Sequence, residues 1–315
     1  AYRVRSSSPV LTDTLQVDPD KSSLEETYSI KTFHDLGEAL AAKPTATFIC
    51  NPTSHHLPIA LEAARAGSHL FIEKPVSHSL DGTSELLNIV QERDLTTYVG
   101  YQLRFHPCIA FLKDKLRSGA VGRVLCVRAT VGEHLPSWHP YEDYRQMYAS
   151  RKDQGGGVIL SQIHEFDYLY MLFGAPLRVF ALGGHLSSLE VDVEDVASIL
   201  MEYRIDGQTL PVHLNQDYLQ RPPQRTCEVV GDEGKLAIDF HALSAVQYRA
   251  DGELAEEHSY TGFNRNQLFV DELEHFFACL GGKARSQITL NDGLQSLKMA
   301  LCAKQSLETG AVVEL

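Results

Sequence analysis

The sequence lacks the features of several protein classes. No apolar run reaches the roughly 18–20 residues that a membrane span needs, and the first residues, AYRVRSSS, have no apolar core like that of a signal peptide. None of the six cysteines forms a CxxC pair, which argues against a zinc site and is typical of reduced thiols in a cytoplasm. The net charge of -13 argues against a nucleic acid or an anionic membrane as partner. We therefore expect a cytoplasmic protein that requires no metal.

A further absence concerns nucleotide binding. A doubly wound nucleotide-binding domain opens with a strand, a G-x-G-x-x-G turn and a helix, and this sequence contains no such fingerprint. Its first segment, AYRVRSSS, reads as the second strand of such a domain. We therefore expect that one βα unit of roughly 30 residues is missing from the N-terminus.

The first hundred residues alternate between helical and strand patterns. After the polar, irregular residues 8–30, helices are predicted at 33–42, 57–67 and 80–94, and strands at 45–50, 69–75 and 96–102. Strands and helices at this spacing indicate βαβ units and a parallel sheet. We predict an α/β Rossmann-like domain, N-terminally incomplete, over residues 1–101.

The remaining residues are rich in strand patterns. Strands are predicted within 122–132, 178–186, 196–207, 210–219, 225–240 and 244–254, with turn signals such as DG and GDEG. Longer helical patterns occur near 160–173, 266–280 and 292–309. We predict a second, α+β domain over residues 102–315 with a large, mostly antiparallel, open-faced sheet.

Two candidate groups follow the predicted strands of the first domain. Asn51-Pro52-Thr53 and Glu73-Lys74 stand at consecutive strand ends, where parallel sheets bind their ligands. Near a substrate hydroxyl, the Lys74 ammonium would polarise the oxygen or relay a proton. The alternative is an ordinary surface lysine after a strand.

A second candidate lies in residues 155–174, GGGVILSQIHEFDYLYMLFG. Its three glycines permit a close approach of the chain to a ligand, and the rest reads as one helix whose apolar face comprises Ile159, Ile163, Phe166 and Tyr170. His164 lies beside that face and is suited to proton exchange near neutral pH. The alternative is a half-buried structural histidine. Glu165 and Asp167 either solvate the helix or pair with neighbours.

The segment 137–157 is rich in aromatic and cationic side chains. Trp138, Tyr148 and Arg151 offer flat faces and hydrogen-bond donors to a polar ring. An amphipathic surface helix is the alternative interpretation. Further along, the segment 215–225 contains Asp217, Arg221 and Arg225, and we expect it at a rim or a subunit contact.

Five short motifs occur in a characteristic order: NPTSHH at 51–56, EKP at 73–75, VGYQLRFHP at 99–107, GGGVILSQIHEFD at 155–167 and EVVGDEGKLAIDF at 228–240. Together they resemble the glucose-fructose oxidoreductase / inositol dehydrogenase (Gfo/Idh/MocA) family over nearly the whole chain. The family motif usually has an aspartate where this chain has Ser161. That difference leaves the proton relay and the substrate open.

The resemblance implies an NAD(P)-dependent oxidoreductase that transfers a hydride between nicotinamide and a secondary hydroxyl or ketone of a sugar, amino sugar, nucleotide sugar or cyclitol. Lys74 and His164 would be catalytic. The expected cofactor-binding residues are Arg5, Ser6, Asn51, Pro52, Thr53, His56, Glu73, Lys74 and Gln102. The expected substrate-binding residues are Arg104, Trp138, Tyr148, Arg151 and Ser161.

Three further expectations complete the prediction. The segment from Tyr2 to Ser7 has arginines but no acidic residue for a ribose diol, which favours NADP over NAD. The resemblance also implies a homodimer or homotetramer that associates through the open sheet face. The alternative function is a catalytically silent dinucleotide-binding regulatory protein; Lys74 and His164 favour the enzyme, and Ser161 keeps the alternative open.

Overall fold

The computed structural model describes residues 2, 10, 12, 17–20 and 23–315. Arg5 and Ser6 lie outside the described residues, so their cofactor contacts stay predictions. Within the segment expected to be irregular, α1 (Leu24–Tyr28) forms a short helix, because the Ser23 side chain accepts a hydrogen bond from the Glu26 amide and caps its first turn. The helix predicted at 33–42 is α2 (Leu36–Ala41).

The first sheet is parallel, as the alternating pattern predicts. Its described strands are β1 (Ala46–Ile49), β2 (His69–Glu73) and β3 (Thr97–Gly100), in the order β1-β2-β3. The connecting helices α3 (His56–Arg65) and α4 (Thr83–Glu92) pack against each other. The three strands therefore end at one edge of the sheet, which gathers the loops that follow them.

The second sheet has nine strands in the order β11-β10-β9-β8-β4-β7-β6-β5-β12. The strands are β4 (Val124–Gly132), β5 (Arg178–Gly184), β6 (Val196–Ile205), β7 (Gln208–Asp217), β8 (Gln224–Gly231), β9 (Gly234–Asp239), β10 (Ser244–Arg249), β11 (Leu254–Ser259) and β12 (Val313–Glu314). Only β4 and β7 pair in parallel, so the prediction of a mostly antiparallel sheet is confirmed. Buried and exposed side chains alternate along its strands, as expected for a sheet covered on one face.

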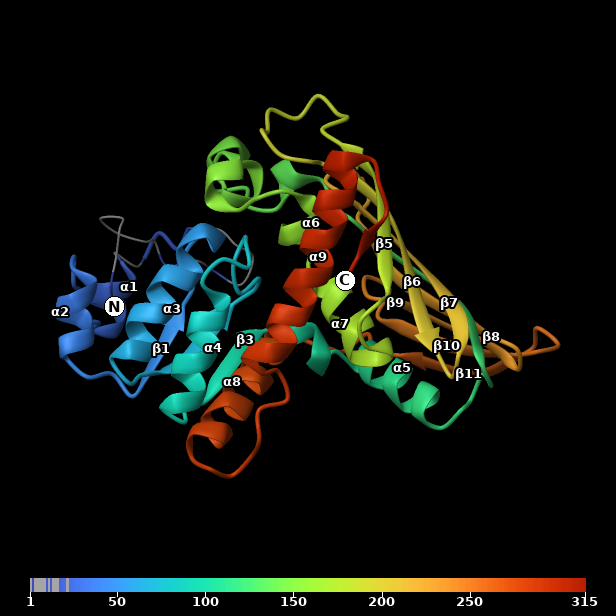
Figure 1. Cartoon of the computed structure of the whole chain (residues 1–315), viewed down its shortest axis with the longest axis horizontal. Coiled ribbons are helices and arrows are strands. Elements are labelled where there is room, and N and C mark those ends of the chain that lie inside the picture. Colours follow the sequence, from blue (N-terminus) through green and yellow to red (C-terminus); the bar gives the residue numbers. More distant parts are fainter. Residues whose placement is uncertain (1, 3–9, 11, 13–16, 21–22) are drawn as a thin grey trace.

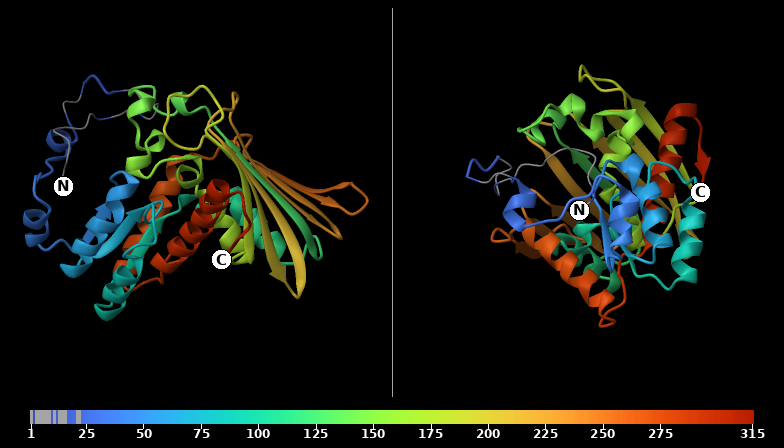
Figure 2. Two further views of the ribbon diagram at one scale, coloured as in Figure 1. Left: turned by 45° about the horizontal axis from the view of Figure 1, so that its top comes forward. Right: turned by 90° about the vertical axis from the view of Figure 1, so that its left-hand side faces the viewer.

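Helices cover one face of this large sheet and leave the other open (Figure 2, left). The helices α5 (Pro107–Arg117), α7 (His164–Phe173) and α9 (Leu290–Thr309) lie on the covered side. On the open side Leu182 and Leu200 are 61% and 51% exposed. This apolar exposure is available for association with another surface.

The two C-terminal helices connect the sheets. In Figure 1, α9 runs between the small sheet and the large one, and α8 (Asn266–Leu280) places Phe276 against Phe71 and Tyr98 of the small sheet. Gly293 of α9 lies so close to Val76 and Val99 that an added Cβ would be 2.7–2.8 Å from their methyl groups. The C-terminal segment thus packs against both sheets.

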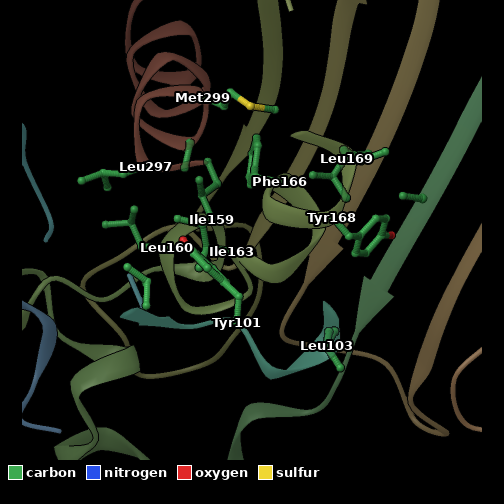
Figure 3. Close-up of a cluster of buried hydrophobic side chains, with 14 of the residues drawn as sticks. Tyr101, Leu103, Ile159, Leu160, Ile163, Phe166, Tyr168, Leu169, Leu297 and Met299 are labelled. Carbon is green, nitrogen blue, oxygen red and sulfur yellow. The ribbon is translucent and has the colours of Figure 1, made fainter. Parts of the chain in front are cut away.

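The single helix predicted near 160–173 consists of two pieces, α6 (Val158–Ser161) and α7. The backbone turns at Gln162, whose side-chain amide donates to the Asp217 carbonyl and whose own carbonyl accepts from the Gln216 side chain. These tertiary bonds replace helical ones and break the helix. Figure 3 shows both pieces packed into one buried cluster with Leu297 and Met299 of α9.

No helix among the described residues combines the length and the hydropathy of a membrane span.

Candidate active site

Lys74 directly follows β2 and meets the second candidate segment. Its amine donates a hydrogen bond of 2.7 Å to the backbone carbonyl of Ser161, 87 positions further along the chain. The positive charge of Lys74 also acts on His164 and lowers the pKa of its imidazole. The structure therefore brings the two predicted catalytic residues to one place.

His164 begins α7 and is only 6% exposed. Its ring meets the ring of Tyr101 edge to face, with 5.8 Å between the ring centroids. Burial, and then the charges of Lys74, Arg225 and Arg265, hold the pKa of His164 well below 6.5. The imidazole is therefore neutral at neutral pH and is in the form that accepts a proton.

Two buried polar atoms beside this pair have no protein partner among the described residues. They are the hydroxyl oxygen of Ser161 and the Nδ1 atom of His164. A buried polar atom left without a hydrogen bond costs about 1–3 kcal/mol. The Ser161 hydroxyl also lies near the hydroxyl of Tyr218, so the two atoms do not define a single ligand position.

His56 braces the two loops that approach Lys74. Its Nδ1 lies 2.7 Å from the carbonyl oxygen of Pro75, and its Nε2 lies 2.7 Å from that of Asn51. Burial lowers the pKa of His56 more than these two contacts raise it. Because both ring nitrogens face backbone carbonyls, His56 joins the two loops, and its predicted contact with a cofactor stays a prediction.

The remaining predicted cofactor residues of the described chain lie at the carboxyl ends of the three parallel strands. Asn51 and Pro52 lead into the short helix η1 (Thr53–His55), with Thr53 buried, while Glu73 ends β2 and Gln102 follows β3. This is the edge at which parallel sheets bind their ligands, and the cofactor contacts of these residues stay predictions. No glycine-rich turn for the pyrophosphate occurs in the part of the chain that the structure describes.

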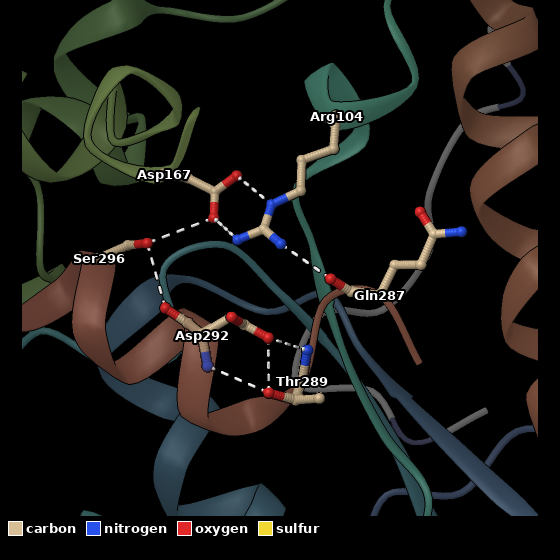
Figure 4. A network of polar contacts seen from close by, with 6 residues as sticks. All are labelled: Arg104, Asp167, Gln287, Thr289, Asp292 and Ser296. Carbon is tan, nitrogen blue, oxygen red and sulfur yellow. Dashed lines mark hydrogen bonds and ion pairs between the residues drawn. The ribbon is translucent and has the colours of Figure 1, made fainter. Parts of the chain in front are cut away.

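Arg104, a predicted substrate contact, forms an ion pair with Asp167 (Figure 4). It donates two hydrogen bonds of 2.9 and 2.7 Å to the Asp167 carboxylate and a third, of 2.8 Å, to the Gln287 carbonyl. Burial lowers the pKa of Arg104 and the Asp167 charge raises it, with a net rise. These contacts tie Arg104 to α7, and its predicted substrate contact stays a prediction.

Glu165 forms a second buried ion pair, with Arg225 of β8, through bonds of 2.8 and 3.0 Å. Glu165 has no exposed side-chain surface. Of the two alternatives for Glu165 and Asp167, pairing with neighbours is therefore confirmed and solvation of the helix is wrong. The two ion pairs hold α7, and with it His164, between the two sheets.

The segment 137–157 forms short 3₁₀ turns rather than the alternative amphipathic helix. Trp138 packs edge to face against Tyr218, and its indole nitrogen is buried with no partner among the described residues. Tyr148 packs against the hydrophobic core, and Arg151 pairs with Asp153. No hydrogen bond within the described residues joins any of the three predicted substrate residues to Lys74 or His164, and their substrate contacts stay predictions.

Two arginines near His164 do not stand out in the sequence as site residues, although the charges of both act on its imidazole. Arg225, which the sequence places at a rim or a subunit contact, lies instead in the buried pair with Glu165. Arg265 stands just before the helix predicted at 266–280, a position where no local pattern marks a ligand-binding residue.

Comparison with known proteins adds two family matches. Residues 7–101 match the oxidoreductase family with the NAD-binding Rossmann fold, and residues 109–237 match the Gfo/Idh/MocA C-terminal domain. Together the matches include both candidate segments.

Individual relatives agree with these matches. The chain is 31% identical over 276 residues to the uncharacterized oxidoreductase YrbE of Bacillus subtilis, covering 86% of this chain and 78% of that protein. It is 26% identical over 313 residues to the myo-inositol 2-dehydrogenase of Thermotoga maritima, covering 98% and 90%. Its fold is similar to that of the WlbA dehydrogenase from Bordetella pertussis, solved with NADH and UDP-GlcNAcA, with a TM-score of 0.76, 21% identity and coverage of 92% and 85%.

Proposed function

Because this chain belongs to the Gfo/Idh/MocA family of NAD(P)-dependent oxidoreductases, we propose that Lys74 and His164 form the centre at which it oxidises or reduces a carbohydrate-like substrate. The observation that carries the proposal is the hydrogen bond from the Lys74 amine to Ser161, which brings Lys74 beside the segment that bears His164. The buried Nδ1 atom of His164, which has no hydrogen-bond partner among the described residues, supports a role for this side chain in binding a hydroxyl-bearing ligand.

When bound, the nicotinamide supplies the hydride acceptor or donor at its C4 carbon. In the oxidation direction, the Lys74 ammonium polarises the substrate hydroxyl and the neutral imidazole of His164 takes its proton. The carbon–hydrogen bond breaks with its electron pair, and the carbon–oxygen double bond forms. The Ser161 hydroxyl donates or accepts a hydrogen bond and carries no charge, so it orients the substrate without relaying a proton.

The substrate class rests on the relatives. Those with named activities include a myo-inositol dehydrogenase and a levoglucosan dehydrogenase, which supports a cyclitol or a sugar ring here. For the cofactor we retain NADP as the proposal, based on the arginines between Tyr2 and Ser7. Fluorescence titrations with NADPH and NADH should show the tighter binding for NADPH; tighter binding of NADH would contradict this preference.

The decisive experiment is the Lys74→Ala variant assayed with a panel of cyclitols, sugars and nucleotide sugars. We expect turnover to fall by at least about 100-fold, the range of proton-transfer catalysis, while NAD(P)H binding persists. Lys113→Ala, an exposed lysine on α5, is the matched control and should leave turnover unchanged. Full turnover in Lys74→Ala would refute the assignment, and cofactor binding by the unmodified protein without turnover of any substrate would favour the silent regulatory protein.

We further propose that the open face of the large sheet joins two copies of this chain. The exposed Leu182 and Leu200 on adjacent strands support the proposal. Sedimentation should show a dimer or tetramer for the unmodified protein and a smaller species for Leu200→Glu. Leu186→Glu, an exposed leucine beyond β5, should not change the assembly; a monomeric unmodified protein would refute the interface.

We also propose a cytoplasmic location. All six cysteines are free thiols in the structure, which supports a reducing compartment. Cell fractionation with a tagged protein would test this, and recovery in an oxidising compartment would contradict it.

A further inference from the structure

A cavity of about 370 Å³ lies next to the reaction centre, on the covered side of the large sheet. It is lined by Arg225 of β8, by Glu133 directly after β4, by Phe240 after β9, and by Phe263 and Arg265 before α8. Its volume falls in the range of about 300–1,000 Å³ that small-molecule sites occupy. The cavity lies close to His164, because two of its lining residues, Arg225 and Arg265, add to the effect of burial in lowering the pKa of His164.

Of the two arginines that line this cavity, one forms an ion pair and the other does not. Arg225 is held by Glu165 in a bidentate ion pair, and the charge of Glu133 acts on it as well. Arg265 is exposed and has no hydrogen bond or ion pair to any side chain among the described residues. The cavity thus has a carboxylate, Glu133, on one part of its wall and an unpaired guanidinium on another.

The helix that follows Arg265 adds to its positive field. Helix α8 begins at Asn266 with no acidic residue in its first turn, and its 15 residues direct the positive end of the helix dipole toward Arg265. The rings of Phe240 and Phe263 form an apolar wall, each within contact of the His106 ring. Such a wall suits the flat face of a sugar ring.

From these observations we propose that the cavity binds an anionic substituent of the substrate, a carboxylate or a phosphate on a sugar ring, through the guanidinium of Arg265. Glu133 accepts hydrogen bonds from ring hydroxyls on the other part of the wall. An arginine recognises either anion in a bidentate fashion, so both share this chemistry. The inference rests on the proposed function, because the anionic substituent belongs to the substrate that is to react at Lys74 and His164.

The reaction itself gives a second reason for an anion here. Proton transfer to His164 creates an imidazolium ion that burial and the cations Lys74, Arg225 and Arg265 disfavour. An anion bound to Arg265 offsets part of that repulsion. A substrate with this substituent therefore helps His164 to act as a base, whereas a neutral sugar does not.

The experiment compares the binding of three probes by titration calorimetry: D-glucuronate, D-glucose 6-phosphate and D-glucose. The unmodified protein, saturated with NADPH, should bind one of the two anionic sugars at least about tenfold more tightly than glucose. Arg265→Gln should weaken that binding by about 10- to 100-fold, the range for one charge-assisted hydrogen-bonded contact, and leave the affinity for glucose unchanged. Arg265→Lys should keep part of the affinity because it keeps the charge.

Arg249→Gln is the matched control, since Arg249 is 57% exposed at the far end of β10 and lies outside the cavity. It should bind all three probes like the unmodified protein. Equal affinity for glucose and both anionic sugars, or an Arg265→Gln variant that binds them as well as the unmodified protein, would overturn the inference. Arg265-dependent binding of an anionic sugar without turnover in any assay would uphold this site and refute the proposed function instead.

Discussion

The ion pair between Arg104 and Asp167 fixes His164 in place, and removing one partner should be costly. The side chains of Arg104 and Asp167 are 8% and 2% exposed, and their two hydrogen bonds are 2.9 and 2.7 Å long. Asp167→Ala leaves a buried guanidinium with the Gln287 carbonyl as its remaining acceptor. We expect this variant to lose about 3–5 kcal/mol of unfolding free energy, as buried pairs do when one charge is left alone.

The magnitude follows from the burial of the pair rather than from the bonds alone. An exposed ion pair contributes about 0–1 kcal/mol, but here only 8% of the Arg104 side chain is exposed, so its charge would stay largely buried. Replacing both partners, in Arg104→Met with Asp167→Leu, removes both charges together. The double variant should therefore be more stable than Asp167→Ala, because no uncompensated charge remains buried.

Urea unfolding, monitored by circular dichroism and by the fluorescence of the single tryptophan, Trp138, measures the stability of the unmodified protein and both variants. The exposed pair of Arg117 with Asp114 supplies the control, and Asp114→Ala should change stability by less than about 1 kcal/mol. An Asp167→Ala variant as stable as the unmodified protein would refute this reasoning. So would an Arg104→Met variant with full stability and a raised KM, since that result would return Arg104 to the substrate site.

Three other predictions concern the site and its supports. The pKa of His164 in the ligand-free protein lies well below 6.5, so the neutral base persists as pH falls. The acidic limb of the kcat/KM profile should therefore lie below pH 6.5, and a midpoint at or above 6.5 would contradict the assignment. Gly293→Ala should lower the free energy of unfolding in urea by about 1–3 kcal/mol, because the added Cβ would collide with Val76 and Val99. This cost should exceed the gain from the better helix propensity of alanine. An unchanged or raised stability would show that α9 can shift. His56→Ala should raise the Kd for NADH more than it lowers kcat. The substitution removes the contacts of His56 with the carbonyls of Asn51 and Pro75 and so frees the two loops expected to hold the cofactor. An unchanged Kd would contradict a positioning role for His56.

The strand and helix patterns were sufficient for most of the architecture. Parallel strands alternating with helices, and a later antiparallel sheet, follow from hydrophobic periodicity, which local sequence records directly. The break at Gln162 did not follow, because the groups that compete for its backbone and side chain, Gln216 and Asp217, lie 54 and 55 positions away. A local pattern contains no information about such distant partners.

The pairing of Arg104 with Asp167 could not be predicted for the same reason. Arg104 follows the strand β3, as the sequence predicts, but strand position does not determine which way a side chain turns. Asp167, 63 positions later, decided that direction through two charge-assisted bonds. The position of Lys74 was easier to predict, because it directly follows a buried strand. The structure adds that its amine reaches the carbonyl of Ser161.

The sequence by itself determined the two sheets, the family and the residue types available for proton transfer, since these depend on periodicity and on short contiguous motifs. Only the tertiary structure decided that Arg104 pairs with Asp167, that His56 braces two loops, and that Arg225 and Arg265 line one cavity. Those outcomes depend on contacts between residues far apart in the chain. Burial and charge at such contacts arise from the packing of several elements, which no single segment specifies.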